Sequence, residues 1–304
     1  MTENKRISDD QLLNQFFKAN VHLGHKSTHR NPKNNRFIWG KRNGMDIIDL
    51  RISLQKTRTA LSEIERYVEN GGKVLFVGTK SFASALIKEY AEKVEMPFVN
   101  RRWLGGTLTN FKTIKQSIKK MLYLESMIAN NKFDNMTKKE KLMQDRKCRD
   151  LAANLGGLRD LNSLPDILFV IDANHDRIAV QEANKLGIPV VSIVDTNTSD
   201  EGISYGIPGN DDSMKAINLY LDLISNSIAQ GAAKIKPEKK ILQAKKTAGA
   251  KVEKAPAKKV DAKRVVTVKS EDDKSVAKRV VTVKKTTTTA KTKPVKKSET
   301  KEQK

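Results

Sequence analysis

The sequence predicts an α/β fold in which helices cover both faces of a parallel sheet, followed by a basic C-terminal tail. Short apolar runs alternate with segments of helical periodicity, as in chains that return each strand through a helix. The runs at 73–77 and 167–171 are apolar almost throughout, which is typical of strands buried on both faces. The tail, residues 231–304, holds 24 basic and 8 acidic residues and no aromatic one. It has too little apolar surface to offset the entropy of ordering, so we expect disorder.

The elements can be placed along the chain from these patterns. The expected helices span residues 9–19, 53–69, 81–94, 176–186 and 211–229, and the expected strands span residues 73–77, 97–99, 167–171 and 189–194. Residues 22–43 are rich in charged and loop-type side chains, so we expect a loop there.

Residues 112–155 interrupt the alternation of strands and helices. Ile114, Ile118 and Met121 recur at helical spacing, and Thr137-x-x-Glu140 fits a capping box at the start of a second helix. Gly156-Gly157 would end that helix. We predict an inserted helical hairpin; an ordinary pair of crossover helices is the alternative. The predicted parts are an α/β domain (1–111 plus 156–230), the hairpin (112–155) and the tail (231–304), in which residues 262–269 recur as 277–284.

Composition excludes several classes of protein. The chain has 304 residues and a formal charge of +23, of which the tail carries +16. The single Cys148 cannot form an intramolecular disulfide, which favours a reducing compartment. No apolar run is long enough to span a bilayer. The N-terminus lacks the apolar core of a signal peptide, and its acidic residues argue against an organellar transit peptide. We therefore expect a cytoplasmic protein that does not bind membranes.

The densest polar cluster, residues 22–42, is a candidate RNA surface. Its cations would neutralise phosphates, and its aromatic and guanidinium planes would stack on exposed bases. The candidate contacts are His22, His25, Arg30, Lys33, Arg36, Trp39, Lys41 and Arg42. The alternative is a solvated basic loop whose aromatic side chains pack inward. The spacing of His22, His25 and His29 also suits a metal, but no Cys, Asp or Glu nearby completes a ligand set, so we expect none.

A second candidate surface lies at residues 100–112, just after an expected strand, and continues into the hairpin. Its glycines would allow close approach of a phosphate that Arg101 and Arg102 could hold. The alternative, a glycine turn anchored by Trp103, is compatible with this reading if the arginines face outward. The further candidate contacts are Lys112, Lys115, Lys119, Lys138, Lys139, Lys141 and Arg146.

Other motifs are weaker. Gly78-Thr-Lys80-Ser81 lacks the spacing of a P-loop, so we interpret it as a helix N-terminus that could hold an RNA phosphate. Acidic residues and a histidine follow the expected strands, namely Asp172, His175, Asp176, Asp195 and Asp200. Helix capping and turn formation explain most of them; a Rossmann-like enzyme acting on a phosphorylated ligand is the alternative. A chromosome-coating protein driven by the basic tail is another.

Long motifs in a fixed order resemble the bacterial small-subunit ribosomal protein 2 family. They are Leu12-Leu13-x-x-Phe16-Phe17-x-Ala19-x-Val21-His22-Leu23-Gly24-His25, Asn31-Pro32-Lys33, Phe37-Ile38-x-Gly40-x-Arg42, the stretch 73–80, Asn100-x-Arg102-Trp103-Leu-Gly-Gly-x-Leu-Thr-Asn110, Pro165-Asp-x-Leu-Phe-Val-Ile-Asp172, Glu182-Ala-x-x-Leu-Gly-Ile-Pro189-Val, Val194-Asp-Thr-Asn197 and Ile207-Pro-Gly-Asn-Asp-Asp212. The resemblance runs from about Leu12 to Ala229.

The resemblance implies a flavodoxin-like or Rossmann-like domain with a protruding coiled-coil hairpin, and no catalysis, cofactor or small-molecule substrate. It implies binding to small-subunit ribosomal RNA at the junction of head and body. It also implies contact with neighbouring ribosomal proteins, including protein 1. The basic tail departs from the short, rather acidic end usual in the family, so the resemblance assigns it no role.

Overall fold

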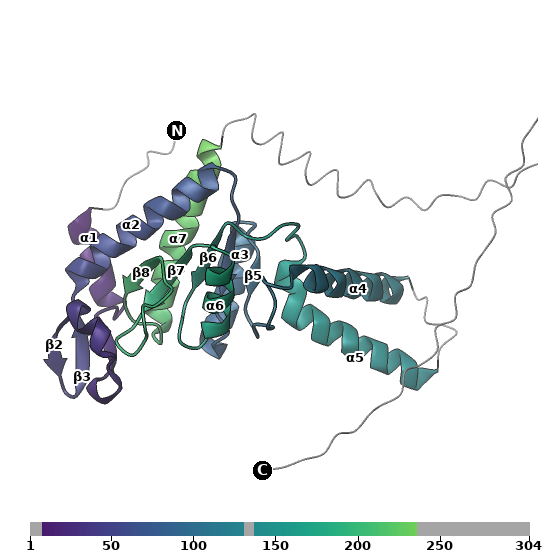
Figure 1. Ribbon diagram of the computed structural model, residues 1–304, viewed down its shortest axis with the longest axis horizontal. Helices are drawn as coiled ribbons and strands as arrows, with labels where there is room; N and C mark the ends of the chain where they lie inside the picture. The colour runs from purple at the N-terminus through teal and green to yellow at the C-terminus, as the bar shows by residue number, and fades with distance from the viewer. Residues whose placement is uncertain (1–7, 131–136, 236–304) are drawn as a thin grey trace, which may run out of the picture. The chain divides into compact units, whose positions relative to one another are not determined.

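The computed structural model describes residues 8–130 and 137–235. These residues form an α/β fold, as predicted, around a five-stranded parallel sheet (Figure 1). The predicted disorder of the tail falls almost entirely on residues outside the described ranges. Within those ranges no helix combines the length and apolar character that crossing a bilayer requires.

The parallel sheet has the strand order β5-β4-β6-β7-β8. Its strands are β4 (Val74–Val77), β5 (Phe98–Val99), β6 (Ile167–Val170), β7 (Val190–Val194) and β8 (Tyr205–Pro208). Counted along the chain within this sheet, the order is 2-1-3-4-5, the flavodoxin-like arrangement. The fifth strand, β8, was not predicted, because Gly206 and Pro208 in a four-residue run argue against a strand.

Both faces of the sheet are covered by helices, which explains the continuous apolar runs. Alternate strand residues enter two cores: Val74 and Phe76 pack in one, and Leu75 and Val77 in the other. The first core is closed by α1 (Asp9–Lys18), α2 (Leu50–Glu69), α3 (Ser81–Lys93) and α7 (Met214–Lys234), and the second by α6 (Arg177–Lys185) and the base of the hairpin.

The expectation of a loop at residues 22–43 was wrong. This segment and the residues after it form an antiparallel sheet with the order β1-β3-β2, from β1 (Leu23–Lys26), β2 (Ile38–Arg42) and β3 (Met45–Ile48), together with 3₁₀ helices at Ser27–His29 and Pro32–Phe37. Asn43 and Gly44, both with positive φ (50° and 78°), join β2 to β3. Asn-Gly between two short runs is a strong hairpin signal, but the high charge of β2 concealed it.

The inserted segment forms α4 (Phe111–Ala129) and α5 (Lys138–Leu155), which pack against each other (Figure 1). Thr137 and Glu140 form the predicted capping box at the start of α5. A 3₁₀ turn, Gly156–Leu158, follows α5 directly and packs against β5 at the edge of the parallel sheet. The predicted tip at 130–136 lies, apart from Asn130, outside the described residues.

The last helix is longer than predicted. It runs to Lys234, so the first four residues assigned to the tail, 231–234, are helical. Helix α7 packs along α2, and Gly231 sits so close that an added Cβ would lie 2.8 Å from the backbone oxygen of Glu65. The folded domain therefore extends past residue 231, where the change in amino-acid composition predicts the start of the tail.

Replacing Gly231 with Ala should lower the free energy of unfolding by about 1–3 kcal/mol, because backbone atoms of α2 would have to move. The check is chemical denaturation monitored by circular dichroism. Gly156→Ala is the matched control: Gly156 has a helical φ of −57°, and nothing lies within 4 Å of its added Cβ. That variant should be neutral or slightly more stable. An equal change in the free energy of unfolding of the two variants would contradict the prediction.

Candidate nucleic-acid interface

The basic segment 22–42 is fixed to the carboxyl end of β7. The buried Asn34 amide donates to the backbone oxygens of Asp195 (2.8 Å) and Thr198 (2.7 Å). The His25 backbone N–H donates to the Thr196 hydroxyl (3.0 Å). The segment is therefore a supported surface, although about 160 residues separate the two sides of each bond.

Carboxylates of the protein itself hold several of the predicted contacts in this segment. Arg30 pairs with the fully buried Asp46, whose pKa it lowers chiefly by hydrogen bonding. Lys33 pairs with Glu201, and Arg36 pairs with Asp200. Arg30 therefore has a structural role, whereas the other two pairs are exposed and can exchange partners with solvent or ligand at little cost.

The exposed side chains of β2 are available to a binding partner. Trp39 is 78% exposed, which makes it the most exposed large hydrophobic side chain among the described residues. Lys41 and Arg42 are exposed, and neither forms an ion pair with any residue in the described part of the chain. Strand β2 lies at an edge of the antiparallel sheet, so this strand presents an aromatic plane beside two available cations.

The two predicted histidine contacts face inward. His22 stacks on Phe17, with ring centroids 4.7 Å apart, and burial lowers its pKa. His25 lies between two carboxylates, with Nδ1 2.9 Å from Asp195 and Nε2 3.1 Å from Asp212. The hydrogen bond to Asp195 is the main reason that the pKa of His25 rises to about 9. Because both ring nitrogens are engaged, neither is available to a phosphate.

Lys80, the cation of the predicted phosphate-holding turn, is neutralised within the fold. Its Nζ lies 2.8 Å from Asp172, 2.8 Å from Asp212 and 3.5 Å from Asp211. Burial and the charge of Asp172 raise the pKa of Asp211 to about 8. A phosphate here would meet carboxylates, which disfavours the prediction that this helix N-terminus holds an RNA phosphate.

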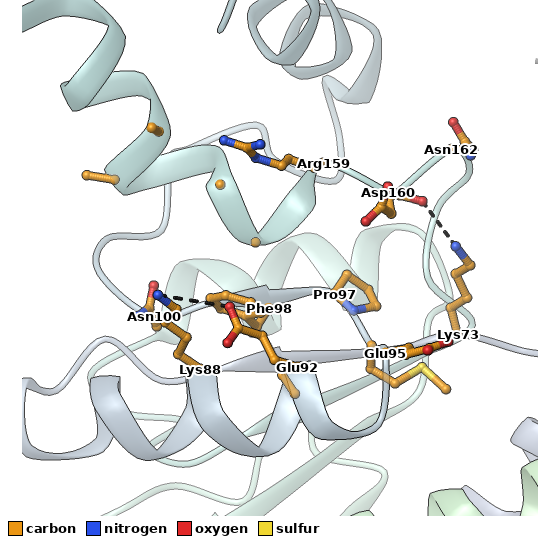
Figure 2. A pocket seen from close by; sticks show the side chains of 16 residues that line it. Lys73, Lys88, Glu92, Glu95, Pro97, Phe98, Asn100, Arg159, Asp160 and Asn162 are labelled. Carbon is orange, nitrogen blue, oxygen red and sulfur yellow. Dashed lines mark hydrogen bonds and ion pairs between the residues drawn. The ribbon is translucent and has the colours of Figure 1, made fainter. Parts of the chain in front are cut away.

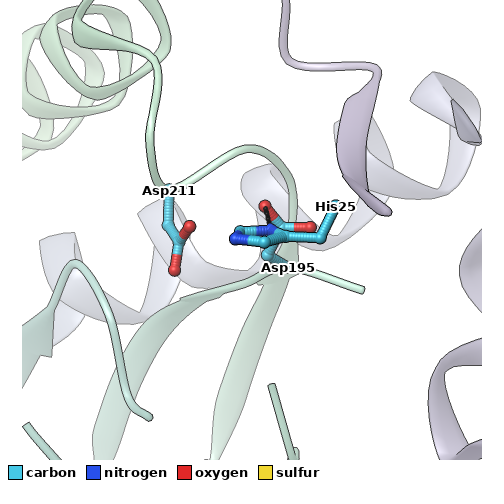
Figure 3. A group of neighbouring side chains, drawn as sticks. All are labelled: His25, Asp195 and Asp211. Carbon is cyan, nitrogen blue, oxygen red and sulfur yellow. Dashed lines mark ion pairs between the residues drawn. The ribbon is translucent and has the colours of Figure 1, made fainter. Parts of the chain in front are cut away.

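A group that could hold a metal ion does occur at the carboxyl end of the parallel sheet. His25, Asp195 and Asp211 each offer one ligand atom, and these atoms lie within 4.8 Å of one another (Figure 3). Nitrogen and carboxylate oxygen donors suit a divalent ion such as zinc. Sequence reasoning looked for acids near the histidines along the chain and found none. The fold supplies them from positions about 170 and 190 residues further along the chain.

The second candidate surface is organised by a residue that the sequence reasoning missed. The buried carboxylate of Glu182, on α6, accepts hydrogen bonds from the Trp103 indole (3.2 Å) and from the backbone N–H groups of Gly106 (2.7 Å) and Leu108 (3.0 Å). Thr109 donates to it as well. Burial opposes ionisation, but these donors outweigh it and lower the pKa of Glu182.

Arg101 and Arg102 lie between two anchored residues. Asn100 donates to the backbone oxygen of Ser84 (3.1 Å) on one side, and Trp103 is held by Glu182 on the other. Both arginine side chains are exposed, and no acid of the described residues pairs with them. The tryptophan is buried and the arginines face outward, so the turn is anchored by Trp103, and the phosphate contact of the arginines stays a prediction.

The predicted hairpin contacts are mostly exposed. Lys115 and Lys141 are the exceptions, since both are half-buried. The Lys115 Nζ donates to the backbone oxygen of Asn162 (3.0 Å), which ties α4 to the sheet domain. The others are exposed on α4 and α5, namely Lys112, Lys119, Lys138, Lys139 and Arg146.

A groove lies elsewhere, between α3 and the base of the hairpin (Figure 2). It measures about 1210 Å³ and contains none of the predicted site residues. Cations such as Lys88 alternate there with Glu92 and Glu95, and the Lys73 ammonium donates to the backbone oxygen of Asp160 (3.1 Å). This mixture of charges shows no preference for an anionic ligand.

Replacing Glu182 with Gln should lower the free energy of unfolding by about 1–3 kcal/mol, because an amide cannot accept all these bonds and leaves buried donors unsatisfied. Since the folded pKa is lowered, this stabilisation is present above the ordinary glutamate pKa of about 4.3 and is lost as the pH falls through the folded value. The difference from wild type should therefore shrink below about pH 4, as measured by urea denaturation. Glu89→Gln, on an exposed face of α3, should change little at any pH.

Comparison with known proteins agrees with the motifs. A family model described as ribosomal protein S2 matches residues 16–231. The small ribosomal subunit protein uS2 of Haemophilus ducreyi is 49% identical over 226 residues, which cover 74% of this chain and 93% of that protein. Its counterpart in Colwellia psychrerythraea is 47% identical over 219 residues, covering 72% and 90%. The resemblance is thereby confirmed, and the chain belongs to the ribosomal protein S2 family.

Proposed function

We propose that the protein is a structural component of the small ribosomal subunit whose core binds ribosomal RNA mainly through backbone phosphates. The observation that carries this proposal is the fixed loop of Arg101 and Arg102, whose guanidinium groups are exposed and unpaired among the described residues. Guanidinium groups on a backbone held in this way can bind phosphate oxygens with little loss of backbone entropy.

Two further surfaces support the proposal. Strand β2 places Trp39 beside Lys41 and Arg42, a combination that suits stacking on an exposed base and pairing with its phosphate. The exposed cations of the hairpin add sequence-independent affinity. Recognition by these groups would depend on RNA shape, with few contacts to base edges.

Family membership settles the main alternative. Ribosomal protein S2 is not an enzyme family, so the Rossmann-like enzyme acting through Asp172, His175 and Asp195 is excluded. In this fold Asp172 accepts backbone hydrogen bonds from Asn174 (2.8 Å) and His175 (3.0 Å), which agrees with the interpretation of such residues as turn formers. Membership also places the protein in the cytoplasmic ribosome.

The position within the subunit is part of the same proposal. We expect the core to lie at the junction of head and body and to contact neighbouring ribosomal proteins, including protein 1. The family resemblance supports this placement, and the exposed aromatic and apolar side chains near the N-terminus, Phe17 and Trp39, are suited to a protein partner as well as to RNA. Small subunits assembled with and without this chain, probed for retention of protein 1, test that part directly.

Replacing both Arg101 and Arg102 with Ala should weaken binding to small-subunit ribosomal RNA and flatten its salt dependence. Each lost phosphate contact removes about 0.7–0.9 from the slope of log K against log salt concentration, so two contacts remove roughly one to two units. Filter binding over a series of salt concentrations measures this slope. Lys88→Ala with Lys93→Ala on α3 removes the same charge away from the proposed surface and should leave the slope nearly unchanged. An equal loss in both double variants would mean that bulk charge alone governs binding.

Deleting residues 236–304 should leave incorporation into small subunits intact, because the proposed RNA contacts all lie before the end of α7. The deletion begins after Ile235 because Gly231 and Lys234 contact α2. Sucrose-gradient sedimentation of cell extracts at ribosome-preserving salt gives the measurement. If the shortened chain left the small-subunit fraction and duplex DNA binding disappeared with it, the chromosome-coating alternative would be favoured.

A further inference from the structure

Two lysines meet across the helical hairpin. Lys120 on α4 directly precedes the buried Met121, and Lys147 on α5 directly precedes the buried Cys148. Successive helical residues are about 100° apart, so each lysine lies on the same flank of its helix relative to the packing face. In an antiparallel helix pair like flanks meet. The two lysines also lie at the same level of the helix pair, because Lys120 is nine residues before the end of α4 at Ala129 and Lys147 is nine residues after the start of α5 at Lys138. The two ammonium groups therefore come together on one side of the hairpin, and contact with Lys147 lowers the pKa of Lys120.

The hairpin does not neutralise this pair. Its acidic residues are used elsewhere: Glu125 pairs with Arg159, Asp145 pairs with Arg149 (2.8 Å), and Glu140 accepts the capping-box bonds of Thr137. Asp150 lies one turn after Lys147 and forms no ion pair with it. Within the described residues neither Lys120 nor Lys147 has an acidic partner within 4 Å.

Adjacent like charges on a packed helix pair repel each other, and an anion between them removes that repulsion. A phosphate group suits this position because its non-bridging oxygens can accept hydrogen bonds from both ammonium groups at once. Both lysines are exposed, so a phosphate can approach without displacing the packing of α4 on α5.

We propose that Lys120 and Lys147 form a two-lysine clamp that holds one phosphate group of an RNA backbone across the hairpin. This inference rests on the proposed function, since it assigns a particular contact within the proposed RNA interface. Neither lysine was among the candidates drawn from the sequence, because the 26 residues between them hide their proximity. The clamp also requires the two helices to stay paired, so RNA binding here would stabilise the hairpin.

The first test uses the full-length free protein and inorganic phosphate. Lysine side-chain NMR signals of Lys120 and Lys147 should shift together as phosphate is added, and Lys147→Gln should abolish the response at Lys120. Lys119, the next residue on α4 and also exposed, is the internal control and should respond weakly. If phosphate shifts Lys120 no more than Lys119, the clamp does not exist.

The second test is a double-variant cycle with small-subunit ribosomal RNA. If one phosphate is shared, Lys120→Gln, Lys147→Gln and the double variant should each reduce the salt slope by about one unit. If the two lysines made independent contacts, each single variant would reduce the salt slope by about one unit and the double variant by about two units. That result would overturn the clamp, and so would a salt slope that does not change. Circular dichroism checks that the exposed substitutions leave the helices intact. If the wild-type protein does not bind the RNA at all, the proposed function fails, and the phosphate titration alone then decides whether the clamp exists.

Discussion

The carboxyl end of β7 is the point on which the arrangement of the core depends. The backbone oxygens of Asp195 and Thr198 are buried there, and a buried carbonyl without a partner costs about 1–3 kcal/mol. The Asn34 amide satisfies both of them. The N-terminal antiparallel sheet is therefore held by polar groups of the parallel sheet as well as by apolar packing. Strand β2, at the edge of the antiparallel sheet, is thereby fixed in position, and so are the side chains that this strand exposes.

Carboxylates inside the fold decide which cations remain for a partner. Asp46 pairs with Arg30, and the acidic residues at the carboxyl end of the parallel sheet pair with Lys80 and His25. Counting charges along the sequence cannot distinguish these cations from Arg101 and Arg102, which form no ion pair with an acid of the described residues. The formal charge of +23 indicates affinity for nucleic acid in general. The distribution of the buried acids determines which surfaces of the protein have that affinity.

Sequence patterns predicted those parts of the fold whose signals are local. The strands of the parallel sheet other than β8, the capping box of α5 and the outward arginines beside a buried Trp103 all follow from neighbouring residues. The antiparallel sheet was missed because its strands are short and charged. The carboxylate of Glu182 and the group of His25, Asp195 and Asp211 were missed because their members lie about 70 to 190 residues from the groups that they meet. Such pairings depend on the order of strands in the sheet, which local patterns do not contain.

The rigidity of these surfaces bears on how the protein would recognise RNA. A flexible basic loop loses rotamer and backbone freedom when it binds, and that loss subtracts from its affinity. Here Glu182 binds the backbone N–H groups of Gly106, Leu108 and Thr109, and the Asn100 side chain anchors the position before Arg101, so much of the ordering occurs when the protein folds. A rigid set of cations fits phosphates only at particular spacings. It can therefore discriminate between RNA shapes without reading bases, which electrostatic attraction from an unstructured basic segment cannot do.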